Sequence, residues 1–323
     1  MKKWIAAVLA TAALMPIFAV ATFAQAQWPT KPLKIIVMWP PGGAADIACR
    51  LLQQPLSEVI GLPVVVENKS GGGGVTGTEA LARSPGDGHT IGMVISSHAS
   101  NVALHAKLPY DALKDFKPIT ILTRSPNVLA VHPSTPYKSV ADIIAAAKAK
   151  PGGLHYVTSG NGTAQHFGIE SLKLATGIDI VHVPYRGAGP ALNDLVAGQV
   201  QIGVLNLAST MPHIQAERVR ALAVTSPQRA PSAPNVPSMA ETVPGFDFSE
   251  WFSLMAPAGV SDELVEKIYA AVVKAARQPA FADKAKESGS EIVLNTPAEF
   301  RAQIEREIVK FKELAVKANI KID

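Results

Sequence analysis

Short apolar runs alternate with segments of helical periodicity along most of the chain. The apolar runs at 33–39, 63–67 and 90–95 each predict a buried strand. Helical spacing between them, at 46–60 and in a shorter segment that ends at Arg83, predicts two helices. The order strand, helix, strand, helix, strand is typical of an α/β domain with a parallel sheet.

A second series of strands and helices begins after Ser125. Ser139 and Asp142 are spaced as a capping box, which predicts the start of a helix. Thr163 is placed to cap a further helix, and Gly177 is placed to end it. The apolar runs predict strands at 127–131, 154–157, 180–183, 201–205 and 221–224.

The last third of the chain is mostly helical in pattern. The stretch 226–246 is rich in proline and lacks periodicity, so we interpret it as the connection back to the first domain. Ser261 and Thr296 each cap a helix, and the second helix carries an apolar stripe at Phe300, Ile304, Ile308, Phe311 and Ala315. We therefore predict two α/β domains, one formed by 27–125 with 240–323 and the other by 126–239.

The N-terminus has the features of a secretory signal peptide. Lys2 and Lys3 precede an apolar stretch at 4–20, and Ala24-Gln25-Ala26 offers small residues where a signal peptidase cleaves. The alternative is an uncleaved membrane anchor, because the apolar stretch is near spanning length. We predict that residues 1–26 are a cleavable signal peptide and that the remaining chain is exported to the periplasm.

Composition excludes several classes of protein. Charged residues make up 17% of the chain, and the formal net charge is +4 without any basic cluster. A nucleic-acid-binding protein would gather basic residues on one face, so we expect no nucleic-acid partner. The only cysteine, Cys49, has Ala48 and Leu51 as apolar neighbours. We interpret it as a small buried hydrophobic residue, the alternative being a reactive thiol.

Gly72-x-Gly74-x-x-Gly77 matches a dinucleotide-binding fingerprint, after a strand and before a helix. The fingerprint also requires an acidic residue at the end of the next strand, where this chain has Ser96-Ser97-His98. We therefore interpret the glycine run as a flexible loop on the wall of a cleft and expect no cofactor.

Signatures of catalysis are equally weak. The sequence has neither a G-x-S-x-G nucleophile elbow nor an H-E-x-x-H zinc motif, and no histidine pair with an acidic partner at metal-ligand spacing. His166 and His182 are the best candidates for a general base, and both are better interpreted as structural histidines. We predict a protein that is not an enzyme and has no metal site.

Two loops combine glycine with small side chains where strands lead into helices, at 40–46 and 158–163. Glycine allows close approach of a ligand to the backbone, and the free N–H groups of a helix N-terminus attract anions. If the two loops face each other across a cleft, they can hold one carboxylate at each end of a small molecule. The alternative is that both are ordinary capped turns. Ligands of open α/β sheets bind at the carboxyl ends of strands, which adds the loops 96–101 and 185–189 and Asn206.

The sequence resembles the Bug family, the periplasmic solute-binding proteins of tripartite tricarboxylate transporters. The resemblance covers essentially the whole chain after the signal peptide and rests on the number and order of matching motifs. These motifs lie at 39–46 (WPPGGAAD), 64–69 (VVVENK), 108–111 (LPYD), 115–116 (DF), 158–163 (TSGNGT), 183–187 (VPYRG), 222–226 (LAVTS) and 256–259 (APAG).

The resemblance implies a two-domain Venus-flytrap fold, type II-like, with a ligand cleft between the α/β domains. It implies a monomer that captures a small carboxylate and delivers it to an ion-coupled permease with one large and one small membrane subunit. The alternative is a sensor that presents its ligand to a signalling kinase. Together, the resemblance and the cleft loops give these ligand-binding residues: Trp39, Gly42, Gly43, Ala44, Asp46, Ser96, Ser97, Ser159, Gly162, Thr163, Gly187, Ala188 and Asn206.

Two departures from the family pattern bear on the ligand. Relatives often have Phe at the position of Trp39 and an acid at the position of Leu205. We expect both side chains to lie where strands open into the cleft, which makes its middle apolar and removes a partner for a ligand ammonium group. We therefore predict an apolar or aromatic dicarboxylate, such as terephthalate, over aspartate, glutamate or citrate. The alternative is that both side chains pack inward.

Overall fold

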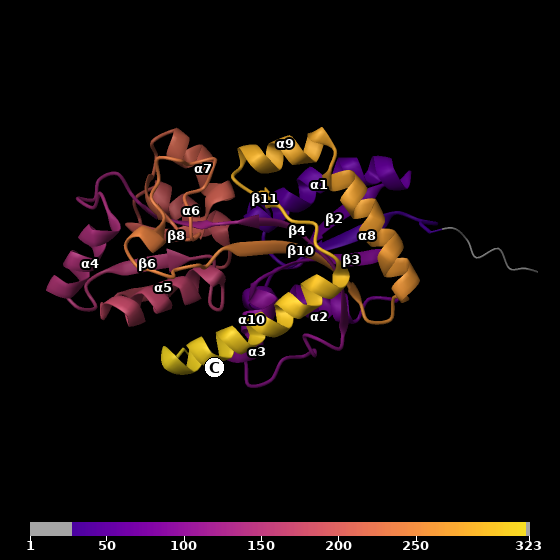
Figure 1. Cartoon of the computed structure of the whole chain (residues 1–323), viewed down its shortest axis with the longest axis horizontal. Helices are drawn as coiled ribbons and strands as arrows, with labels where there is room; N and C mark the ends of the chain where they lie inside the picture. The colour runs from indigo at the N-terminus through magenta and orange to yellow at the C-terminus, as the bar shows by residue number, and fades with distance from the viewer. Residues whose placement is uncertain (1–27, 321–323) are drawn as a thin grey trace, which may run out of the picture.

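Two separate β-sheets, each packed against helices, organise residues 28–320, the part that the computed structural model describes (Figure 1). The predicted signal peptide lies outside these residues. One sheet has six strands in the order β11-β4-β10-β3-β1-β2, and the other has five in the order β7-β6-β8-β5-β9. We call the parts built on them the first and the second lobe.

The first lobe contains the strands β1 (Leu33–Val37), β2 (Val64–Asn68), β3 (Thr90–Ile95), β4 (Phe116–Ser125), β10 (Glu250–Pro257) and β11 (Glu291–Ile292). Its helices are α1 (Ala44–Ile60), the 3₁₀ turn η1 (Gly72–Gly74), α2 (Val75–Ala82), α3 (Ser97–Leu104), α8 (Asp262–Ala276), α9 (Pro279–Glu287) and α10 (Pro297–Lys317).

The second lobe contains the strands β5 (Asn127–Val131), β6 (His155–Thr158), β7 (Val181–Pro184), β8 (Ile202–Asn206) and β9 (Arg220–Val224). Its helices are α4 (Val140–Ala149), α5 (Ala164–Thr176), α6 (Ala188–Val196), α7 (Leu207–Gln215) and the 3₁₀ turn η2 (Met239–Glu241).

Helix ends lie where the caps predicted them. The Ser139 side chain accepts a hydrogen bond from Asp142 N, and the Asp142 carboxylate accepts one from Ser139 N, which completes the capping box. Thr163 caps α5, and Gly177 ends it with a left-handed φ of 68°. The predicted apolar stripe of α10 is buried throughout. Local side-chain chemistry therefore sets these boundaries.

Three strands of the first lobe were not predicted: β4, β10 and the two-residue β11. β4 and β10 pair with each other in antiparallel fashion, and β10 also pairs antiparallel with β3, so the sheet is mixed and not purely parallel. All eight residues of β10 are buried, and Pro118 interrupts the pattern of β4. Glu250 and Ser253 interrupt the apolar run of β10, and threonines interrupt that of β4, so neither has the continuous apolar run that marks a buried strand.

The segment 96–101, expected to be a cleft loop, is instead the start of α3. Ser96 has helical backbone angles and forms no side-chain cap, so the usual sequence signal for a helix start is missing. Ser96, Ser97 and His98 are all buried. The helix places them in the interior of the first lobe, which corrects the expectation of a loop.

The chain crosses between the lobes at two neighbouring places. Only Pro126 separates β4 from β5, and the segment that leads into β10 returns beside it. Asn127 joins the two crossings, because its Nδ2 donates to Phe248 O at 3.1 Å. α10 adds a third connection: its Phe311 packs against Phe167 of the second lobe, with tilted rings whose centroids are 4.7 Å apart. The strands divide between the two sheets as the predicted domains require, but η2 and Phe248, whose N–H donates to Thr225 O, lie with the second lobe, so the domain boundaries stay a proposal.

Cys49 lies in the core of the first lobe with no exposed surface. Burial raises the pKa of its thiol, with a smaller contribution from Asp46 in the same direction. The residue is a packed hydrophobic side chain, as predicted. Within residues 28–320, we find no helix long and apolar enough to span a bilayer.

Candidate functional site

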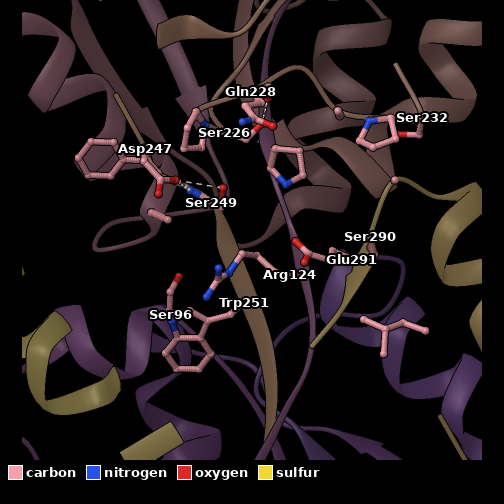
Figure 2. Close-up of a pocket in the computed structure, with 18 of the residues that line it drawn as sticks. Ser96, Arg124, Ser226, Gln228, Ser232, Asp247, Ser249, Trp251, Ser290 and Glu291 are labelled. Carbon is pink, nitrogen blue, oxygen red and sulfur yellow. Dashed lines mark hydrogen bonds between the residues drawn. The ribbon is translucent and has the colours of Figure 1, made fainter. Parts of the chain in front are cut away.

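A cavity of about 860 Å³ lies beside the two crossings (Figure 2). We call it the crossing cavity; α9, β11, α10 and the 226–232 segment contribute to its wall. Arg124 and Trp251 lie in its middle, and charged side chains of both signs surround them. Ser96 is the only predicted site residue that lines it. Its position therefore does not match the predicted ligand cleft.

A much smaller cavity, of about 20 Å³, lies between the lobes. We call it the interlobe cavity. The predicted residues Trp39, Gly43, Ala44, Ser159, Ala188 and Asn206 all line it. They come from segments far apart in the sequence, and the fold brings them together from both lobes.

Three helices begin at the interlobe cavity. α1 of the first lobe starts at Ala44, and its first intrahelical bond is donated by Ile47 N to Gly43 O. The N–H groups of the preceding turn therefore remain outside the helical ladder. α6 starts at Ala188 and α7 follows Asn206, both in the second lobe. Three helix N-termini give the cavity a positive potential that suits an anion.

Hydrogen bonds of its backbone hold Ser159 in place, so its hydroxyl group is free to bind a ligand. Its N–H donates to Gln165 Oε1 at 2.7 Å, and its carbonyl accepts from Gly187 N at 2.9 Å. Gln165 is held in turn by Asn127, whose Oδ1 accepts from Gln165 Nε2 at 3.1 Å. The Ser159 hydroxyl makes no hydrogen bond within residues 28–320 and lines the cavity. Gln165 is a site residue that the sequence analysis missed.

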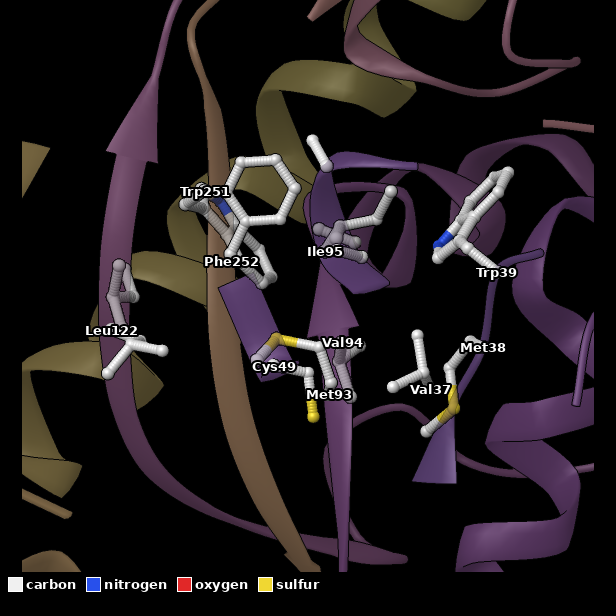
Figure 3. Close-up of a cluster of buried hydrophobic side chains, with 14 of the residues drawn as sticks. Val37, Met38, Trp39, Cys49, Met93, Val94, Ile95, Leu122, Trp251 and Phe252 are labelled. Atoms are coloured by element: carbon white, nitrogen blue, oxygen red, sulfur yellow. The ribbon is translucent and has the colours of Figure 1, made fainter. Parts of the chain in front are cut away.

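Apolar side chains form one wall of the interlobe cavity. Trp39 follows β1, Ile95 ends β3 and Phe252 lies near the start of the antiparallel β10. The three side chains lie in one row (Figure 3). Trp39 thus lies where it was expected. Leu205 does not: it is fully buried and packs with Ala130 and other core residues of the second lobe. Successive side chains of a strand face opposite ways, and on β8 it is Asn206 that faces the cavity.

The Asp46 carboxylate accepts hydrogen bonds from residues of its own lobe and does not line the interlobe cavity. Burial opposes its ionisation, but hydrogen bonds from Arg50, from Gly42 N at 3.0 Å and from Asn68 together hold its pKa below the usual value. Both oxygens are occupied by these donors, with Arg50 Nε at 2.9 Å from Oδ2 and Asn68 Nδ2 at 2.9 Å from Oδ1. Asp46 therefore fixes the shape of the 40–46 loop.

Other predicted residues also shape the loops without lining the interlobe cavity. Thr163 Oγ1 donates to Gly160 O at 2.9 Å and accepts from His166 N at 3.3 Å, and Gly162 N donates to His166 Nδ1 at 3.3 Å. Gly187 lies against the ring of Pro40 in the opposite lobe. The remaining predicted residues, Gly42, Ser96 and Ser97, lie in the first lobe outside the cavity lining.

A second opening leads from the interlobe region to the surface. This outer cleft, of about 530 Å³, shares Trp39, Pro40 and Ser159 with the interlobe cavity. The glycine run 71–74 forms part of its wall, where a cleft loop was predicted, and Arg186 lines it as well. The two cavities therefore share part of their walls.

His166 and His182 lie in the second lobe and stack with ring centroids 4.1 Å apart. Burial lowers the pKa of His166 to about 4 and that of His182 to about 3, so both are neutral near pH 7. Neither lines the interlobe cavity or the outer cleft. Within the described part of the chain, no three His, Cys, Asp or Glu side chains are grouped to hold a metal ion.

Comparisons with known proteins agree with this arrangement. Residues 48–320 match the model of the tripartite tricarboxylate transporter family receptor. The protein BugT of Bordetella pertussis is 35% identical over 287 residues, which are 88% of each chain. The solved structure of R. palustris Rpa4515 with adipate is 34% identical, with a TM-score of 0.88 over 91% of this chain and all of that one.

The structure of the periplasmic binding protein BugD is 28% identical, with a TM-score of 0.87 over 91% of this chain and all of that one. These matches extend over both lobes and establish the two-domain periplasmic-binding-protein fold. The chain therefore belongs to the tripartite tricarboxylate transporter family of receptors, as a Bug-type solute-binding protein and not an enzyme.

Proposed function

We propose that the interlobe cavity captures a small dicarboxylate, which the protein then delivers from the periplasm to a two-subunit, ion-coupled permease. The observation that carries the proposal is the convergence of three helix N-termini, one from the first lobe and two from the second, on one cavity. The partial positive charges at the helix N-termini of both lobes favour binding of an anion between the lobes.

Solved relatives support a ligand with two carboxylates. One is named for its complex with adipate, and another, MatC from Rhodopseudomonas palustris, for bound malate. Each of these molecules has a carboxylate at both ends. The first-lobe donors around Ala44 and the second-lobe donors around Ser159 and Ala188 suit such a molecule.

The apolar wall favours a hydrocarbon spacer between the carboxylates. Trp39, Ile95 and Phe252 offer aromatic and aliphatic surface to that spacer. An aromatic face adds about 0.5–1.5 kcal/mol beyond the burial of area. Leu205 is buried in the core of the second lobe and offers no surface to the spacer. We infer that adipate or terephthalate binds more tightly than glutamate or citrate.

Binding must involve motion of the lobes. A single water molecule needs a cavity of about 10–15 Å³. The interlobe cavity, of about 20 Å³, is therefore too small for any dicarboxylate. The short crossing at Pro126 allows one lobe to rotate against the other. Capture then follows the hinge closure known for two-lobed binding proteins.

Competition calorimetry tests the proposal. The protein without residues 1–26 is titrated with adipate, terephthalate, malate, glutamate and citrate at one pH and ionic strength. We expect a dicarboxylate with an apolar spacer to bind most tightly. If glutamate or citrate binds as tightly as adipate and terephthalate, the apolar spacer is wrong, and if no carboxylate binds, the proposed function is wrong.

A further inference from the structure

A buried carboxyl group lines the interlobe cavity, and none of the features above accounts for it. Glu250 is the first residue of β10 and is 3% exposed. The only hydrogen bond of its carboxyl group within residues 28–320 comes from Ser96 Oγ, at 3.4 Å from Glu250 Oε1. Burying a charged carboxylate with one weak hydrogen-bond donor destabilises the fold. The position of Glu250 in the wall of the cavity therefore suggests a role in ligand binding.

Strand geometry directs Glu250 toward the ligand. In the antiparallel pairing, Glu250 is opposite Ser125, and Trp251 is opposite Arg124. Trp251 and Arg124 line the crossing cavity, so this face of the two strands points away from the cleft. Glu250 and Phe252, two residues apart, both line the interlobe cavity. Glu250 therefore lies beside Phe252 of the apolar wall, among the residues that line the cavity.

The titratable groups on the elements around Glu250 either bond to other residues or line the crossing cavity. His98 of α3 bonds to Ala112 O at 2.9 Å, and Arg124 of β4 lines the crossing cavity. The remaining groups are Asp46 of α1, held by Arg50, His166 of α5, stacked on His182, and Glu307 of α10, bonded to Trp251 Nε1. Burial raises the pKa of Glu250 to about 7, the Ser96 hydrogen bond alone opposing this shift.

We propose that Glu250 binds the ligand in its neutral form, donating a hydrogen bond from its carboxyl group to one carboxylate of the bound dicarboxylate. This inference rests on the proposed function. Two carboxylates in contact share a proton readily, because like charges at short range disfavour ionisation of both. The cavity thus takes up a dianion together with one proton whenever Glu250 is ionised beforehand.

The specificity of the cavity follows from this role. A neutral carboxyl group is a hydrogen-bond donor to an anion, whereas an ionised one would attract an ammonium group. The protein therefore selects simple dicarboxylates over amino dicarboxylates, and it releases them more easily as the pH rises. Selectivity against an ammonium group then comes from Glu250 and not from the lack of an acid at Leu205, which is buried in the core.

Isothermal titration calorimetry with adipate tests the inference. Wild type, Glu250→Gln and Glu307→Gln are titrated at pH 6.5, 7.5 and 8.5, each in two buffers of different ionisation enthalpy. Glu307 is the matched control, because it is a second carboxyl group whose pKa burial raises, and it lines the crossing cavity instead. The amide of glutamine keeps a donor at position 250 but cannot lose a proton.

We expect wild-type affinity to fall by about tenfold or more from pH 6.5 to 8.5, with proton uptake on binding at the higher pH values. Glu307→Gln keeps this dependence, and Glu250→Gln loses both the dependence and the proton uptake. Equal pH dependence in wild type and Glu250→Gln overturns the inference but leaves the proposed function intact. Wild-type binding without proton uptake at pH 8.5 also overturns it, whatever the folding of the variants.

Two further outcomes separate the alternatives. Glutamate is titrated in parallel, and an affinity for glutamate that rises with pH and disappears in Glu250→Gln would show that an ionised Glu250 pairs with an ammonium group, which overturns the inference. If adipate, malate and terephthalate all fail to bind wild type at pH 6.5, the proposed function fails and the inference fails with it.

Discussion

Gly162 of the second lobe lies directly against Leu104 of the first. A Cβ atom on Gly162 would be 2.8 Å from Leu104 Cδ1 and 3.1 Å from Asn101 Oδ1, closer than such atoms normally approach. Ser100 Oγ also donates a hydrogen bond to Gly162 O across the same boundary. The absence of a side chain at Gly162 therefore lets the lobes meet.

We expect Gly162→Ala to weaken dicarboxylate binding by at least threefold, because the methyl group hinders closure. Gly177→Ala is the matched control: Gly177 has φ 68° against 74° for Gly162, and a Cβ there meets nothing within 4 Å. Both variants carry similar backbone strain. Calorimetry should show a loss only for Gly162→Ala, relieved by a second change, Leu104→Ala. Equal affinities in the two glycine variants would contradict the prediction.

Ser159→Ala should lower the affinity for dicarboxylates by about tenfold or more. The hydroxyl group lines the interlobe cavity, and a hydrogen bond to a charged group contributes about 1.5–3 kcal/mol. Calorimetry at pH 6.5 measures the loss. Thr158→Ser is a control on the neighbouring residue, whose hydroxyl bonds to Gly160 O and His182 and does not line the cavity. Unchanged affinity in Ser159→Ala would remove Ser159 from the site.

Gly43→Val should abolish measurable binding without unfolding the protein. Gly43 has φ −78° and ψ 164°, an extended conformation that valine adopts readily, and a Cβ there would approach no atom closer than 3.5 Å. The added side chain would occupy the cavity and cover the N-terminus of α1. A thermal-shift assay should show a normal melting transition that adipate no longer raises. Retained stabilisation by adipate would show that the ligand lies elsewhere.

The free energy of unfolding should fall as the pH is lowered from 6.5 to about 4. Burial lowers the pKa of His98 and of His166 to about 4 and that of His182 to about 3. The unfolded chain, with histidine pKa values of about 6.5, binds more protons than the native state in this range, so stability rises with pH. Urea denaturation at several pH values measures the effect.

Glu250 has the opposite effect on the pH dependence of the free energy of unfolding. Its raised pKa means that the native state binds more protons than the unfolded chain between pH of about 4.5 and 7, so its contribution to stability is lost as the pH rises through 7. The histidine effect should therefore be steeper in Glu250→Gln than in wild type. A free energy of unfolding that is flat with pH in Glu250→Gln would contradict the histidine prediction.

Cys49 should be inert to thiol reagents in the native protein. The side chain has no exposed surface, and burial raises the pKa of its thiol, so the reactive thiolate is scarce. We expect reaction with a chromogenic disulfide to proceed only in denaturant, with one equivalent released. Rapid labelling of the native protein would show that the core of the first lobe opens.

Local signals in the sequence specified the boundaries of many elements. The capping residues Ser139, Thr163 and Thr296 act within one turn of their own helix, so their effect is readable without the fold. β4 and β10 were missed for the opposite reason. β4 packs against α10, α8 and its neighbouring strands, and β10 packs against α2, β3 and β4. A periodic pattern in the sequence does not reveal contacts with segments so distant.

The sequence by itself determined the family and the two-domain fold, through the number and order of its motifs. It also determined the loops that begin α1, α5 and α6, because glycines and caps have local conformational preferences. Only the tertiary structure decided which side chains face the ligand. Leu205 packs inward while Asn206 faces the cavity, and Glu250 reaches the cavity from a strand that was not predicted. The direction of a side chain depends on strand register, and register is set by partners far away in the sequence.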